Sequence, residues 1–139
     1  MATEIKDAKD GLKTRIETIS GLRVLDHIPN DVNEFPMAHI QFTGRTSSDS
    51  LDGVSFMGTI TLTVYIRMSN ELEAMDELDK YMETTGTESI EAAMDADQSW
   101  ESKVAIGQLL GIVNVRRFQT DQGAWLHAAD FMCQFRTAA

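Results

Sequence analysis

The clearest pattern in the 139-residue sequence is an alternation of apolar and polar positions between Val54 and Met68. A period of two predicts one long β-strand with a buried side and a solvent-facing side. Gly58 interrupts the apolar series and is a natural position for a bulge. The expected buried side carries Val54, Phe56, Ile60, Leu62, Val64, Ile66 and Met68.

This strand is longer than the diameter expected for the domain that contains it. At about 3.3 Å per residue it spans roughly 50 Å, whereas a compact domain of this size has a diameter of roughly 37 Å. Residues 43–53, rich in Gly, Ser and Thr, predict a loop before it. The strand therefore either bends or projects as a hairpin arm whose apolar side a neighbouring subunit covers. The candidate subunit-interface residues are Phe42, Arg45, Val54 and Phe56.

Three segments have the three- and four-residue apolar spacing of amphipathic helices. The first covers residues 3–20, and the Gly21 that follows suits a left-handed residue beyond the helix end. The second covers residues 70–83, and its expected buried stripe is Leu72, Met75, Leu78 and Met82. The third is short, has Thr87 as its cap, and is expected to bury Ile90, Ala93 and Met94.

The other apolar segments predict strands at residues 22–27, 37–42, 112–119 and 124–136, the last two joined by a turn. The expected buried side of the last strand is Trp125, Ala129, Phe131, Cys133 and Phe135. Residues 95–111 show no clear period, so no element is predicted there. The order α-β-β-β-α-α-β-β indicates a single domain, residues 1–139, of the α+β class. An N-terminal helix and two central helices pack on a mostly antiparallel sheet with a projecting β-hairpin.

The net charge of −10, from 22 acidic and 12 basic side chains, is concentrated in one segment. Residues 71–101 contain eleven acidic side chains and one basic, Lys80, and the rest of the chain is balanced. The plain interpretation is a solvated helical face. The sharper interpretation is a surface that faces DNA without holding it, because like charges repel, or one that meets a basic partner.

The sequence predicts no catalytic site, no cofactor and no metal site. His27, His39 and His127 lack the spacing of a zinc pair. Cys133 lies about 20 Å along a strand from His127, too far for a nucleophile and its base, and is expected to be a buried small apolar residue. Residues 95–106 begin like a calcium-binding EF-hand loop but lack its glycine and its glutamate.

The composition is that of a globular domain, with 42% hydrophobic and 24% charged residues. No apolar run approaches 18 residues, so no membrane contact is expected. The first residues lack the apolar region of a signal peptide. A single cysteine excludes an intrachain disulfide and favours a reducing compartment.

Several stretches together resemble a known family. They are Ile19-Ser20-Gly21-Leu22-Arg23-Val24, Asp26-His27-Ile28-Pro29, Glu34-Phe35-Pro36, Leu78-Asp79-Lys80-Tyr81-Met82 and Gly86-Thr87-Glu88-Ser89-Ile90-Glu91-Ala92-Ala93. With the long alternating strand, they resemble the tail terminator and head–tail joining (neck) proteins of long-tailed bacteriophages. The resemblance covers residues 4–135.

The resemblance implies a virion structural protein, not an enzyme, that is made in the bacterial host cytoplasm and is located at the head–tail junction. Such proteins form a homo-oligomeric ring, usually a hexamer, that ends the tail tube and joins it to the head-side connector. The implied partners are the tail tube protein and the head–tail connector proteins, and DNA passes through the ring without specific binding. The expected acidic lumen or partner face is Glu73, Asp76, Glu77 and Glu83.

Three alternatives remain open. The first is a head-completion adaptor ring on the portal side, which differs from a terminator only in the ring that it touches. The second is a small α+β enzyme or ligand-binding domain, which needs a deep pocket with converging polar groups. The third is a soluble interaction module whose acidic segment binds a basic protein.

Overall fold

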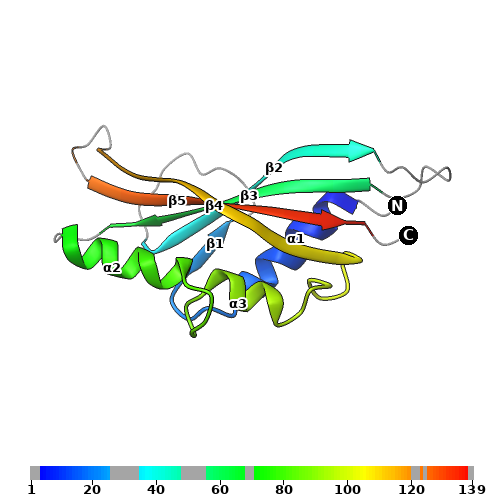
Figure 1. The fold of residues 1–139 in the computed structure, drawn as a ribbon, viewed down its shortest axis with the longest axis horizontal. Coiled ribbons are helices and arrows are strands. Elements are labelled where there is room, and N and C mark those ends of the chain that lie inside the picture. Colours follow the sequence, from blue (N-terminus) through cyan, green and yellow to red (C-terminus); the bar gives the residue numbers. More distant parts are fainter. Residues whose placement is uncertain are drawn as a thin grey trace.

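The computed structural model describes residues 4–25, 35–47, 56–67, 71–119, 123 and 125–137. Within them, three helices lie on one side of a five-stranded sheet (Figure 1). The helices are α1 (Glu4–Ile16), α2 (Glu71–Met82) and α3 (Ile90–Asp95). The strands are β1 (Arg23–Leu25), β2 (Met37–Ser47), β3 (Phe56–Ile66), β4 (Ile106–Gln119) and β5 (Trp125–Arg136). The predicted α+β class and element order are confirmed.

The strands lie across the sheet in the order β1-β2-β3-β5-β4. β1 runs parallel to β2, and the other three pairs are antiparallel, so the predicted mostly antiparallel sheet is confirmed. The β4–β5 hairpin docks through β5 onto β3. As a result, β4 is the outermost strand at one edge of the sheet.

The alternating sequence of β3 forms the centre of the core, as predicted. The side chains of Ile60, Leu62 and Val64 have no exposed surface, and that of Ile66 is buried as well. They belong to one apolar cluster with α1, which contributes Ala8, Leu12 and Ile16. Removal of this apolar surface from water stabilises the packing of the helices on the sheet.

The described part of β3 is not an unpaired arm. It pairs with β5 from Met57, opposite Arg136, to Ile66, and with β2 along nearly the same length. The neighbouring strands are as long as β3, with 11 residues in β2 and 12 in β5. The expectation of a projecting strand assumed a spherical body, whereas the whole sheet is elongated (Figure 1). The segment 48–55, which includes Val54, lies outside the described residues.

Two local expectations around this hairpin are wrong. Residues 43–47 of the predicted loop belong to β2, and residues 44–47 pair with the first residues of β3. Gly58 is no bulge, since it pairs regularly with Arg45 and Phe135, and the irregularity lies in β2 between Phe42 and Gly44. Gly58 has a different role: a Cβ atom there would overlap the ring of Phe135.

The helix α2 is rotated relative to the predicted orientation. Leu72 and Met75, expected in its buried stripe, are 67% and 50% exposed. Leu78 is buried and Met82 packs partly against the core, as predicted, while Ala74 and Tyr81 are the other buried residues of the helix. Two large apolar side chains of the predicted stripe, Leu72 and Met75, are therefore left largely in water.

The helix α1 ends at Ile16 instead of continuing to Ser20. The hydroxyl of Thr18 donates a hydrogen bond to the carbonyl of Arg15 at 2.6 Å, within the turns that follow the helix. Ile19 nevertheless reaches the core, and Gly21 has the expected left-handed conformation, with φ of 85°.

The helix α3 buries Ile90, Ala93 and Met94, as predicted. Its cap is Ser89 rather than Thr87, because the Ser89 hydroxyl accepts a hydrogen bond from the backbone N–H of Ala92 at 3.1 Å. The helix therefore begins two positions later than the sequence pattern indicated.

The segment before β4, for which no element was predicted, forms a tight loop with an unusual backbone. Trp100, Glu101 and Ser102 have consecutive positive φ angles of 47°, 62° and 64°. This backbone carries the Trp100 ring into the core, where it is completely buried. Gly107 of β4 leaves room for the Trp100 ring, because a Cβ atom there would overlap it. Gly11 of α1 likewise leaves room for the carbonyl oxygen of Trp100.

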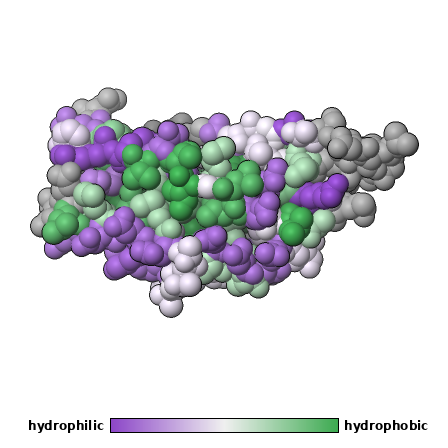
Figure 2. Space-filling view, viewed as in Figure 1, coloured by the Kyte–Doolittle hydropathy of each residue, from purple (hydrophilic) through white to green (hydrophobic). Residues whose placement is uncertain are grey.

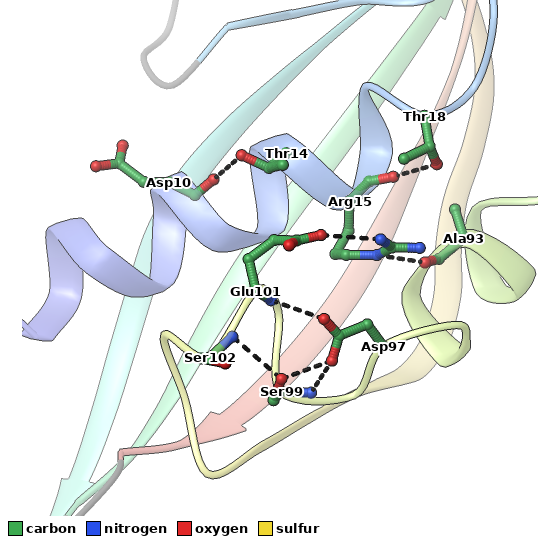
Figure 3. Close-up of polar contacts among 9 residues, drawn as sticks. All are labelled: Asp10, Thr14, Arg15, Thr18, Ala93, Asp97, Ser99, Glu101 and Ser102. Carbon is green, nitrogen blue, oxygen red and sulfur yellow. Dashed lines mark hydrogen bonds and ion pairs between the residues drawn. The ribbon is translucent and has the colours of Figure 1, made fainter.

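Polar contacts hold this loop against α1 and α3 (Figure 3). The carboxylate of Asp97 accepts hydrogen bonds from the backbone N–H groups of Ser99 and Glu101, at 3.0 and 3.1 Å. The Arg15 guanidinium of α1 donates to the Glu101 carboxylate at 2.9 Å and to the Ala93 carbonyl at 3.1 Å. The loop thereby positions the first residue of β4, which is Ile106 rather than the predicted Ile112.

The buried side of β5 differs at one end from the prediction. Ala129, Phe131, Cys133 and Phe135 are buried as expected, whereas Trp125 is 46% exposed. The ring of Trp125 stacks against the guanidinium of Arg117, whose Cζ lies 4.1 Å from the ring centroid. Leu126, on the opposite side of the strand, is buried.

Candidate functional site

The titratable side chains of the described residues do not converge on a reaction centre. No group of three or more His, Cys, Asp or Glu side chains among them could hold a metal ion. His39 of β2 pairs with Thr63 of β3, which pairs with Asp130 of β5, so these three residues share one face of the sheet. His127 lies three positions before Asp130 on β5. Because side chains alternate along a strand, His39 and His127 project from opposite faces of the sheet.

Cys133 is completely buried on β5, as predicted. Its sulfur lies 3.9 Å from the Met94 sulfur, and burial raises the pKa of the thiol to about 12. The thiol therefore stays protonated at neutral pH and is a packing group rather than a nucleophile. Of the helices that the structure describes, none is long and apolar enough to cross a bilayer.

The structure describes the side chains of two of the four expected subunit-interface residues. Phe42 is half-buried, and its ring centroid lies 6.4 Å from that of Phe135, so it packs partly against its own core. Arg45 is exposed near the end of β2. Phe56 is the first residue of β3, and Val54 lies outside the described residues. The interface assignment of these four residues stays a prediction.

A surface of exposed apolar side chains that the sequence pattern did not predict follows the outermost strand, β4. Hydrophobic side chains gather along the course of β4, with hydrophilic groups on both sides (Figure 2). We call this surface the β4 band and define it by Ile106, Leu110, Val113 and Val115, which are 41–58% exposed. The valine and leucine pattern resembles that of a buried strand, but β4 lies at the edge of the sheet.

Two bulges alter the positions of Leu110 and Val115 within the β4 band. The register of β4 with β5 shifts between Leu109 and Gly111 and again between Val113 and Arg116. Leu110 and Val115 lie within these shifts, so they do not occupy regular positions over β5. Bulges of this kind bend an edge strand and hinder its pairing with another chain.

The second bulge is fixed by the carboxylate of Asp130. It accepts hydrogen bonds from Thr63 at 2.9 Å, Asn114 at 3.1 Å and Arg116 at 3.2 Å. Asn114 has φ of 54°, and its carbonyl also accepts from Arg116 at 2.9 Å. Burial opposes ionisation of Asp130, but these hydrogen bonds and the charge of Arg116 outweigh it and lower its pKa.

A shallow groove separates α2 from the second half of β4, with a volume of about 210 Å³. Its walls are mainly apolar. One wall consists of Met75, Leu78, Asp79 and Met82 of α2, and the other of Val115, Arg116, Arg117 and His127. The exposed Met75 and Val115 lie on opposite lips, so the apolar surface of the β4 band continues into the groove. Pockets that bury a small ligand have volumes of roughly 300–1,000 Å³, so this groove fits a few protein side chains better.

The expected acidic residues lie on α2 or directly after it. Glu73, Asp76 and Glu83 are exposed and Glu77 is partly buried. Asp76 and Glu77 lie three and four positions after Glu73, which gathers the three carboxylates on one side of the helix. We call this side the acidic face of α2. Its role as a lumen or partner face stays a prediction.

Lys80 modifies the acidic face in a way that the sequence did not reveal. Its Nζ lies 3.3 Å from a Glu77 oxygen and 3.8 Å from a Glu88 oxygen, which links α2 to the turn before α3. The hydrogen bond to Glu77 and the charges of Glu77 and Glu88 raise the pKa of Lys80. Burial, with the same two carboxylates, raises the pKa of Tyr81.

Comparisons with known proteins give little further information. No protein-family model matches the sequence, and a search of curated proteins finds no significant match. Among solved structures, the chain has a weak likeness to a chain from the virion of a native gene transfer agent particle. The identity is 12%, the likeness covers 90% of this chain and 82% of that chain, and the TM-score is 0.31. A TM-score this low does not establish a shared fold.

Proposed function

We propose that this protein is a structural subunit of a phage-like virion rather than an enzyme. In this proposal, copies of the chain form a ring at the head–tail junction that terminates the tail tube and joins it to the head-side connector. The ring is a hexamer, as is usual in the family that the sequence resembles. The protein is made in the bacterial host cytoplasm and is then built into the particle.

The observation that carries the proposal is the β4 band. It places four large apolar side chains, each 41–58% exposed, on one edge strand. Contiguous exposed apolar surfaces on soluble proteins mark interaction sites. Because the bulges of β4 hinder strand pairing, the band is suited to side-chain packing against a shaped partner surface. This is the behaviour expected of a subunit that completes its surface by assembly.

The acidic face of α2 supports the role of a DNA conduit. Residues 71–101 carry essentially all of the net charge of −10. A lumen lined by like charge lets DNA slide, because it repels the phosphate backbone and does not adhere to it. In this proposal Glu73, Asp76, Glu77 and Glu83 face the DNA, which passes without specific binding.

The mass in solution and the negative-stain appearance of the pure protein test the proposal. Rings with a central hole, or a monomer that assembles into rings on the ends of isolated tail tubes, would support it. A protein that stays monomeric in both settings would overturn it. Binding to portal complexes instead of tail tubes would replace the terminator by the head-side adaptor.

A further inference from the structure

Two exposed surfaces lie at opposite ends of β4. At the Gln119 end, the groove beside α2 has the exposed carboxylate of Asp79 on its α2 lip. Its β4 wall carries Arg116, which pairs with Asp130, and Arg117, which stacks on Trp125. At the Ile106 end, a face of the sheet carries exposed apolar side chains and a positive charge. Figure 1 shows that these ends are far apart along the longest axis of the molecule.

The sheet face at the Ile106 end contains no acidic residue among its paired, described positions. Ile106 pairs with Arg136, which pairs with Met57, and the next two rows on this face contain uncharged residues. They are Gln108, Gln134 and Thr59 in one row, and Gly111, Met132 and Thr61 in the other. Ile106 is 47% exposed and Met132 is 39% exposed. Among the paired positions that the structure describes in these three rows, Arg136 carries the one charge.

The groove at the other end has unfilled apolar walls. Met75 and Val115 remain 50% and 58% exposed on its two lips, and Leu72, one turn before Met75, is 67% exposed. Part of the α2 stripe that the sequence pattern predicts to be buried, namely Leu72 and Met75, is thus left uncovered by the rest of the chain. Apolar side chains from outside, accompanied by a positive charge for Asp79, would complete it.

We propose that the groove beside α2 receives the Ile106 end of β4 from a second copy of this chain. In this contact, Ile106 and its apolar neighbours pack between Met75 and Val115, and Arg136 meets Asp79. A contact that brought two acidic α2 helices together would be disfavoured, because like charges across an interface are strongly unfavourable.

The contact is head-to-tail, because each copy gives its Ile106 end and receives at its groove. A head-to-tail contact closes into a ring when the rotation between copies closes. The inference deepens the proposed function and rests on it, since it assigns the surfaces through which the ring subunits meet.

A charge exchange tests the pairing. Arg136→Glu and Asp79→Lys should each weaken assembly about tenfold or more, and the double variant should recover most of the loss. Sedimentation velocity over a concentration series measures the effect, with Lys9→Glu on α1 as a control that should leave assembly unchanged. Single variants that assemble like the unmodified protein, or a double variant weaker than either, would overturn the proposal.

Mixing two apolar variants tests the head-to-tail geometry. Met75→Asp damages only the groove, and Ile106→Asp damages only the inserting end. Both positions are about half exposed, so circular dichroism and thermal unfolding should match the unmodified protein. Each variant alone should stay monomeric, and an equal mixture should form one-to-one dimers without rings. A mixture that remains monomeric would contradict the head-to-tail contact.

The two proposals fail in different ways. Head-to-tail oligomers that do not associate with tail tubes would support this contact and overturn the proposed function. Rings that cap tail tubes but withstand all four substitutions would support the function and overturn this contact.

Discussion

Phe135 of β5 lies directly over Gly58 of β3, and its ring occupies the space that a side chain at residue 58 would need. Gly58→Val should therefore destabilise the fold by about 1–3 kcal/mol, because the valine must displace a buried ring in a packed core. Urea unfolding followed by circular dichroism measures the change. Gly111→Ala is the matched control, since a Cβ atom there meets no neighbour within 4 Å, and it should change stability by about 0.5 kcal/mol or less. Equal effects at the two positions would contradict this packing.

Loss of the Ser89 cap should destabilise α3. Ser89→Ala removes the acceptor for the Ala92 N–H and a donor to the Glu83 carbonyl, so we expect a loss of about 0.5–2 kcal/mol. Thr87→Ala is the control, because Thr87 is exposed and does not cap the helix, and it should be nearly neutral. A larger loss for Thr87→Ala would mean that the helix begins where the sequence pattern first indicated.

The carboxylate of Asp130 should make stability depend on pH in the acidic range. Its pKa in the folded protein lies below the ordinary 3.8, so its contribution is complete above that value and is lost as the pH falls through the folded pKa. Asp130→Asn should cost about 1–3 kcal/mol at neutral pH, because Arg116 and Thr63 lose a charged acceptor.

The pH series supplies the decisive comparison for Asp130. Thermal unfolding of the unmodified protein and of Asp130→Asn, measured between pH 7 and the lowest pH at which both fold, should show a difference that narrows below the ordinary pKa. A difference that is constant across the series would show that the carboxylate contributes through shape alone.

Neutralisation of the acidic residues tests the proposed lumen. Glu73→Gln, Asp76→Asn, Glu77→Gln and Glu83→Gln together should impair DNA passage in assembled particles, because the surface loses its repulsion of phosphate. DNA release from particles measures the effect. A control variant changes the net charge equally at other positions, with Asp7→Asn, Asp10→Asn, Glu17→Gln and Asp95→Asn. Normal ejection by particles with the neutralised α2 would exclude a lumenal position for these residues.

The sequence predicts the α+β fold well because its strongest signals are local. The alternation in β3 identifies Ile60, Leu62 and Val64 as core residues, and each is completely buried. The same local rule fails for α2, where the apolar spacing of Leu72 and Met75 matches a buried stripe but tertiary packing turns Ala74 and Tyr81 inward. The orientation of a helix with apolar residues on two sides is decided by its neighbours.

The loop that carries Trp100 illustrates a second limit. Its positive φ angles are held by Asp97 and by Arg15, which is more than 80 positions away in the sequence. A local pattern contains no record of such a contact. The β4 band was missed for a similar reason, since nothing in residues 106–119 tells an outermost strand from a central one.

The two bulges of β4 affect how readily the free chain aggregates through its edge strand. They divide its ladder with β5 into three short runs, 106–109, 111–113 and 116–119. A free edge broken in this way offers no continuous template on which strands of other molecules could stack into fibrils. The exposed apolar side chains of the β4 band can therefore stay uncovered on the free chain without promoting strand-to-strand aggregation, and in the proposed assembly a complementary surface covers them.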